Sequence, residues 1–385
     1  MIVSHLTYYI QTMKKNYFVL IVFAVLLVAC GNSGKQAANG SDEPVFSKKS
    51  DDGQAAVQNE MEIADIVKQW QGKTITLKTP EKEPGIEKLA EAFNRQWPTL
   101  ASSGEKKVDA ANGYMTSFVE GQIQEACFWK LANGHRLFAV SFDQPDEPVI
   151  TAVMFYDYDP AKGTLTPTKN GVLDFKPIFE GSMHSFKLPQ KGKDIIVDEY
   201  IPGWDKAIYH IYKFDGKTHN LAGSRIQDYD QMFKKYKEYD DMYKSEDATF
   251  AKFALVDIDE DGNPELWFRS AKGGDGAFFA INGGNVSLLI TENYHSVLAF
   301  YKGAIQQSGG CGTGCHMAEF VTLKDSQFGS RVRWFTQYSM DGEDVVEEEY
   351  TKDEKPMTKA EGEKFVKSLG KDIDPNPVWH PLLAD

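Results

Sequence analysis

The stretch QEACFWKLANGHRLFAVSF, residues 124–142, decides the fold class. Two runs rich in aromatic and apolar residues, Gln124–Leu131 and Arg136–Phe142, flank the dipeptide Asn133-Gly134. Asn-Gly favours a tight two-residue β-hairpin turn, because both residues tolerate positive φ angles. The stretch therefore predicts two antiparallel strands that are neighbours in sequence.

The same alternation of apolar runs and turn residues continues along most of the chain. Strands that follow one another so closely predict a mainly β fold with a few helices. Such β-meander hairpins build either a sandwich or a propeller-like array. The other predicted strands are Val149–Tyr156, a short run at Leu165, Ile195–Tyr200, Ala207–Phe214, Phe250–Val256, Glu265–Arg269, Ala277–Ile281, Val286–Ile290, Val297–Tyr301, Glu319–Leu323 and Arg331–Tyr338.

Three segments have helical spacing instead. A helix is predicted from Ile86 to Trp97, a second within Asp228–Asp247, and a third from a capping box at Thr358–Glu361 to Gly370. The second helix interrupts the series of strands and predicts a domain boundary. We therefore expect an N-terminal β-rich domain over 61–225 and a C-terminal β-rich domain over 226–385.

The N-terminus has the pattern of a secretory signal peptide. Lys14 and Lys15 precede the apolar run Tyr17–Ala29, and small residues follow. The run has about 13 residues, whereas a membrane-spanning helix needs roughly 20. We expect a signal peptide over 1–29, with Met13 as the effective start.

The end of this run is more specific. Leu27-Val28-Ala29-Cys30, followed by Gly31, resembles the lipobox of bacterial lipoprotein precursors. The resemblance implies cleavage before Cys30, lipid on its sulfur and acylation of the new N-terminus, which together give stable anchoring. It also implies a place in the cell envelope, at the outer membrane if the cell is Gram-negative. Residues 30–60, poor in large apolar groups, are expected to be a disordered tether.

Charge narrows the range of partners. The chain has 56 acidic and 42 basic residues, a net charge of −14. An acidic surface repels nucleic acid and anionic headgroups, so we expect no nucleic-acid partner and membrane contact only through the lipid. A divalent cation is compatible with this charge.

The strongest chemical signal is an acidic loop, DIDEDGNPE, at residues 257–265. Asp257, Asp259 and Asp261 occupy positions 1, 3 and 5 of this loop, and Gly262 follows at position 6. Alternate acids in a tight turn point inward together, and calcium prefers six to eight such oxygens. The pattern resembles the EF-hand calcium loop over about 10 residues.

The remaining ligands depart from the EF-hand pattern. Asn263 at position 7 is expected to offer its backbone carbonyl, but position 12, where an EF-hand has glutamate, is Phe268. Glu265 at position 9 is the replacement ligand. Because Pro264 and the β-like flanks oppose an exiting helix, the loop resembles the strand-loop-strand calcium sites of integrin-type and bacterial β-propeller repeats. A structural calcium ion is expected, with an ion-free acidic turn as the alternative.

Two cysteines lie close together in a glycine-rich segment. Cys311 and Cys315 are expected to form a disulfide, since exported proteins meet oxidising conditions. Cys315-His316 also resembles part of a c-type haem motif, but three residues rather than two separate the cysteines. A zinc site and a redox-active dithiol remain as further alternatives. Cys127 is expected to be a buried apolar residue.

Two classes of function stay open. The first is a non-enzymatic module at the envelope that binds or scaffolds a glycan or protein ligand. The second is a hydrolase of glycans or peptides that calcium stabilises. No catalytic residue is assigned, because Ser182 and His184 lie close together without an evident acid partner. Residues 250–370 resemble a set of exported bacterial proteins of unknown function, a resemblance that implies a fold and no activity.

Overall fold

The computed structural model describes residues 73–95, 105–119, 122–143, 152–168, 173–239, 248–293, 295–339, 342 and 344–383. Every described residue lies in one compact unit, Asn59–Asp385. The signal peptide, Cys30 and the tether thus lie outside the described residues and stay predictions. Among the described residues, no helix is long and apolar enough to span a membrane.

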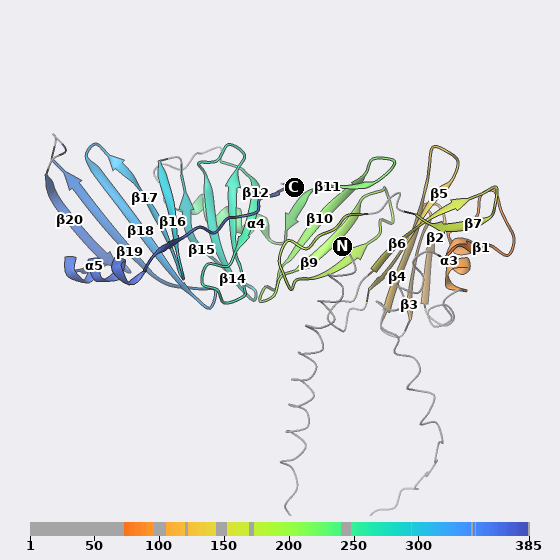
Figure 1. Cartoon of the computed structure of the whole chain (residues 1–385), viewed down its shortest axis with the longest axis horizontal. Coiled ribbons are helices and arrows are strands. Elements are labelled where there is room, and N and C mark those ends of the chain that lie inside the picture. The colour runs from red at the N-terminus through yellow and green to blue at the C-terminus, as the bar shows by residue number, and fades with distance from the viewer. Residues whose placement is uncertain are drawn as a thin grey trace, which may run out of the picture. The chain divides into compact units, whose positions relative to one another are not determined.

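The described residues form four antiparallel sheets and three helices, so the predicted mainly β class is confirmed (Figure 1). Within each sheet most strands pair with the strand that follows in sequence. Such pairing needs only short connections, which is why turn residues alone predict it well.

The first sheet has the strand order β1-β7-β6-β5-β4-β3-β2. The predicted hairpin forms between β4 and β5, but its turn is one residue longer than expected. The amide of Gly134 donates to the carbonyl of Leu131, and Gly134 has φ +83°. A three-residue loop with glycine in the left-handed region is also a common hairpin connection. The strands are β1 (Ile75–Thr76), β2 (Glu105–Asp109), β3 (Tyr114–Val119), β4 (Gln122–Lys130), β5 (Arg136–Asp143), β6 (Ala152–Asp159) and β7 (Thr164–Pro167).

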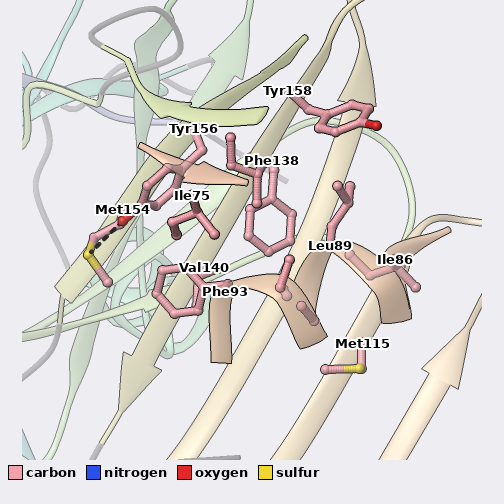
Figure 2. Packing of buried hydrophobic residues seen from close by; sticks show 14 of the residues in the cluster. Ile75, Ile86, Leu89, Phe93, Met115, Phe138, Val140, Met154, Tyr156 and Tyr158 are labelled. Carbon is pink, nitrogen blue, oxygen red and sulfur yellow. Dashed lines mark hydrogen bonds between the residues drawn. The ribbon is translucent and has the colours of Figure 1, made fainter. Parts of the chain in front are cut away.

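Helix α3 (Ile86–Asn94) packs its apolar side on this sheet (Figure 2). Leu89 and Phe93 are fully buried, and the Phe93 ring meets Tyr156 edge-on with centroids 5.6 Å apart. Burying each such side chain stabilises the fold by about 1.5–3 kcal/mol. The predicted extension to Trp97 lies outside the described residues.

The second sheet has the order β11-β10-β9-β8. It shares one hydrophobic cluster with the first sheet, in which Trp129 and Leu137 join Val197 and Tyr212. Two sheets that share a buried face pack in the manner of a sandwich. Its strands are β8 (Met183–Lys187), β9 (Ile195–Tyr200), β10 (Ala207–Phe214) and β11 (His219–Ile226).

The third sheet has the order β15-β14-β13-β12-β23, and helix α4 (Tyr229–Glu238) packs against it. The same cluster includes Ile208 and Ile226 of the second sheet. Residues on both sides of the predicted domain boundary, between positions 225 and 226, therefore share one core. The domain boundary there stays a prediction. The strands are β12 (Phe250–Val256), β13 (Glu265–Ser270), β14 (Gly276–Asn282), β15 (Asn285–Glu292) and β23 (His380–Pro381).

The fourth sheet has the order β21-β20-β19-β18-β17-β16-β22. Helix α5 (Lys359–Ser368) begins at the predicted capping box, in which Thr358 and Glu361 bond each other's backbone amides. A cluster including Ile258, Ile305 and Val321 joins the third and fourth sheets. The strands are β16 (Ser296–Tyr301), β17 (Ala304–Gly312), β18 (Cys315–Lys324), β19 (Gln327–Tyr338), β20 (Val345–Lys352), β21 (Lys355–Met357) and β22 (Asp372–Ile373).

Candidate metal centre

The acidic loop connects two paired strands of the third sheet. Val256, the last residue of β12, pairs with Glu265, the first of β13, and no helix follows the loop. Its chain reverses sharply because Glu260 has φ +59° and Gly262 has φ +87°. The expected strand-loop-strand arrangement, rather than an EF-hand helix pair, is therefore present.

The first acid of the loop fixes the loop's own backbone. Asp257 accepts hydrogen bonds from the amides of Asp261 at 3.1 Å and Gly262 at 2.9 Å, one on each carboxylate oxygen. Asp261 in turn accepts from the amide of Asn263 at 2.7 Å. These bonds wrap the backbone around the carboxylates, as short polar side chains do in turns.

Three of the predicted ligands converge. Asp257, Asp259 and Glu265 each offer a carboxylate oxygen, and these three atoms lie within 4.8 Å of one another. Glu265 is fully buried, and its Oε2 accepts from the amide of Ile258 at 2.9 Å. Its Oε1 has no hydrogen-bond partner among the described residues, and neither does Oδ1 of Asp259. Buried oxygens without partners carry a large desolvation cost, so the geometry favours a positively charged ligand here.

The electrostatics agree with this geometry. Burial raises the pKa of Glu265 to about 8, and the negative charges of Asp259 and Asp257 add to the effect of burial, although the bond from the Ile258 amide opposes it. Burial likewise raises the pKa of Asp259, with the charges of Asp261 and Asp257 contributing. Carboxyl groups held together in a low-dielectric site resist ionisation, and a cation between them removes that resistance.

Two predicted ligands lie outside this trio. Asp261 accepts through Oδ2 from the hydroxyl of Ser326 at 2.9 Å, and the backbone carbonyl of Asn263 lies 2.9 Å from the same hydroxyl. The side chain of Asn263 donates to the carbonyl of Ile281 at 3.0 Å and packs directly against Gly203. Asn263 therefore attaches the loop to its surroundings, while its carbonyl faces Ser326.

Sequence reasoning did not find Ser326. This residue lies in the turn between β18 and β19, is 1 % exposed, and donates its amide to Oδ2 of Asp259 at 3.0 Å. In the sequence around it, the polar pair Asp325-Ser326 between two apolar strands indicates a turn but gives no sign that this turn contacts the acidic loop. No family model matches the sequence, and no curated protein matches it either. The candidate site consequently stands on its own geometry.

The cysteine pair lies at a hairpin tip. Cys311 and Cys315 are bonded as a disulfide, with Cα atoms 5.3 Å apart, at the end of the β17–β18 hairpin. A disulfide leaves neither sulfur free as a thiolate for zinc or as an attachment point for haem. Cys127 is buried, and burial raises the pKa of its thiol well above the usual value.

A second polar cluster lies within the second sheet, and it supplies the acid that sequence reasoning did not find beside Ser182. The hydroxyl of Ser182 donates to Oε1 of Glu199, whose Oε2 lies 2.8 Å from Nε2 of His210. The other ring nitrogen of His210 lies 2.8 Å from the hydroxyl of Ser224. All four side chains are at most 1 % exposed.

This serine-histidine-carboxylate arrangement is a structural network rather than an accessible catalytic site. Although burial raises the pKa of Glu199, the bonds from His210 and Ser182 outweigh it and lower the pKa overall. The carboxylate is therefore held ionised within the core. A nucleophile needs a path for its substrate. Because Ser224 is fully enclosed, it cannot act as one in this conformation.

Proposed function

We propose that this chain is an exported, lipid-anchored protein of the cell envelope that binds one structural calcium ion in the acidic loop. The observation that carries the calcium site is the convergence of Asp257, Asp259 and Glu265, with the buried Oε1 of Glu265 lacking a partner among the described residues. Carboxylate oxygens at this spacing match the preference of a hard cation.

The ligand set explains the expected affinity. Asp257, Asp259 and Glu265 provide the direct carboxylates, and Asp261 can join because a carboxylate oxygen keeps a second lone pair after one hydrogen bond. Water completes the coordination shell. A short protein ligand list favours weak binding, with Kd about 10⁻⁴ to 10⁻³ M, which suits an extracellular module.

The proposed role of the ion is structural. It sits where β12 turns into β13, beside the core of the third sheet, and Glu265 is enclosed by protein. A metal that activates water for catalysis keeps an open coordination position facing a substrate cleft. The surroundings therefore favour a binding or scaffolding module over a hydrolase, and the serine-histidine-carboxylate cluster of the second sheet is buried.

The envelope location rests on the sequence of the N-terminus. The basic pair, the short apolar run and Leu27-Val28-Ala29-Cys30 support export and lipidation. A Cys30→Ser variant tests this directly. The wild type should fractionate with membranes and the variant should be soluble or remain an unprocessed precursor. Equal membrane retention of a fully processed variant would contradict the anchor.

Calcium binding is tested by calorimetric titration of the full-length protein after treatment with a chelator. We expect one site, with binding lost in Asp259→Ala. Glu260→Gln is the matched control, because Glu260 belongs to the same loop but pairs outward with Lys302. The proposal of a calcium site is wrong if the wild type shows no binding up to about 10 mM calcium, a concentration ten times the largest Kd expected.

A further inference from the structure

The acidic loop is held by a residue from a different sheet. We propose that Ser326 is a positioning residue of the calcium site, and that calcium binding is coupled through it to the docking of the fourth sheet on the third. This inference rests on the proposed calcium site and adds to it a residue 61 positions beyond Glu265 in the sequence.

Ser326 contacts three members of the loop with two groups. Its amide donates to Asp259 at 3.0 Å, and its hydroxyl lies 2.9 Å from Oδ2 of Asp261 and 2.9 Å from the carbonyl of Asn263. A hydroxyl has one proton, so it donates to one of these oxygens at a time. Each of these contacts orients an oxygen that the sequence pattern places in the ligand set.

The backbone of the turn is arranged for these contacts. Asp325 and Ser326 both have φ +52°, the left-handed conformation that lets a two-residue turn connect twisted strands. Residues other than glycine pay a conformational cost there, which the surrounding contacts must offset. The turn at Asp353-Glu354 has the same conformation, with φ +49° and +65°, and both of its residues are exposed.

A second turn of the fourth sheet also bonds the loop. The amide of Gly303, between β16 and β17, donates to the carbonyl of Ile258 at 2.9 Å, and the amide of Leu323 donates to Gly303 at 2.8 Å. Ile258 itself is fully buried in the cluster that joins the two sheets. The loop is thus bonded by two turns of the neighbouring sheet.

Coupling follows from this arrangement. Without a cation the carboxylates repel each other, and the loop holds Asp259 and Asp261 less firmly in place for Ser326. With a cation they are drawn together, and the loop holds Asp259 and Asp261 where they accept the hydrogen bonds of Ser326. Thermodynamic linkage makes the effect mutual: docking of the turn strengthens calcium binding by the same factor with which calcium strengthens docking, so a turn that docks less well binds calcium more weakly.

The test compares Ser326→Ala with Ser330→Ala in the full-length protein. Ser330 belongs to the same hairpin, but its hydroxyl bonds Thr322 and not the loop. Calcium titration should show affinity about tenfold weaker for Ser326→Ala, within the common range of coupling between sites. Ser330→Ala should bind like the wild type. Ser326→Gly, which relaxes the left-handed backbone but also lacks the hydroxyl, should bind as weakly as Ser326→Ala.

Hydrogen exchange provides the readout of docking. In the wild type, calcium should slow exchange of the amides of Ser326 and Gly303 at least fivefold more than those of Asp353 and Glu354. Calcium binding with equal affinity in wild type and Ser326→Ala, or with no change in exchange at Ser326 and Gly303, would overturn this inference and leave the calcium site standing. Absence of calcium binding in the wild type would overturn both.

Discussion

Replacing Glu265 with glutamine should stabilise the protein in the absence of calcium and abolish its stabilisation by calcium. The pKa of Glu265 is raised to about 8 from the ordinary 4.5, chiefly by burial. A carboxyl group whose pKa is raised by folding holds its proton more strongly in the folded state than in the unfolded state. The free energy of unfolding therefore falls as pH rises from the unfolded pKa, about 4.5, to the folded pKa, about 8. At 1.36 kcal/mol per pH unit, the wild type without metal has lost about 3 kcal/mol by pH 7.

Glutamine has the same shape and no charge, so Glu265→Gln should avoid this loss. Its carbonyl can still accept from the amide of Ile258. In chelator at pH 7 we expect the variant to be about 3 kcal/mol more stable, a rise of roughly 5 °C in Tm. In about 5 mM calcium the wild type should gain about 1–2 kcal/mol and the variant nothing.

The assay is thermal melting of the full-length protein from pH 5 to 8, in chelator and in calcium. Glu260→Gln is the control, because it removes a charge from the same loop at an exposed position. It should change neither the pH dependence nor the response to calcium. The reasoning is refuted if Glu265→Gln is no more stable than the wild type in chelator at pH 7, or if it keeps the full response to calcium.

Three further predictions concern packing and protonation. Gly362→Ala should lower the Tm measured by differential scanning calorimetry, because the new Cβ would lie 2.1 Å from the Tyr350 ring. This clash should outweigh the preference of helices for alanine over glycine, about 1 kcal/mol. Gly203→Ala should destabilise the protein by about 1–3 kcal/mol and weaken calcium binding in a titration, because at φ +80° its Cβ would lie 2.6 Å from the Asn263 side chain. Burial lowers the pKa of His184 below 6.5, so stability is lost as pH falls through 6.5. Urea unfolding at pH 7.5 and 5.5 should show a smaller loss in His184→Phe, and an equal loss would contradict the assignment.

The parts of the fold that sequence predicted are those in which local and tertiary preferences agree. The strands around Asn133-Gly134 and the helix at Thr358 follow from turn and capping residues within a few positions. Strands β17 and β20 were not predicted, because one is rich in glycine and the other carries consecutive glutamates. Pairing with neighbours on both sides overrides such weak propensity.

The candidate site likewise has a part that sequence predicted and a part that it did not. The acids of residues 257–265 are predictable because a single turn gathers them, and their spacing is visible in the sequence. Ser326 reaches Asp259 only because the third and fourth sheets pack together, and Glu199 meets His210 only across paired strands. Contacts of this kind depend on topology, which periodicity within one segment does not encode.

The pairing of β22 and β23 has a consequence for biogenesis. The short strand Asp372–Ile373 pairs with β16, and His380–Pro381 pairs with β12, two strands that are synthesised earlier. Until they are in place, β16 and β12 are unpaired edge strands, and such edges are where β proteins self-associate. A ribosome stalled before residue 372, or a protease that removes the tail, would therefore leave both edges open to pairing with another chain, and residues 372–381 prevent this by covering them.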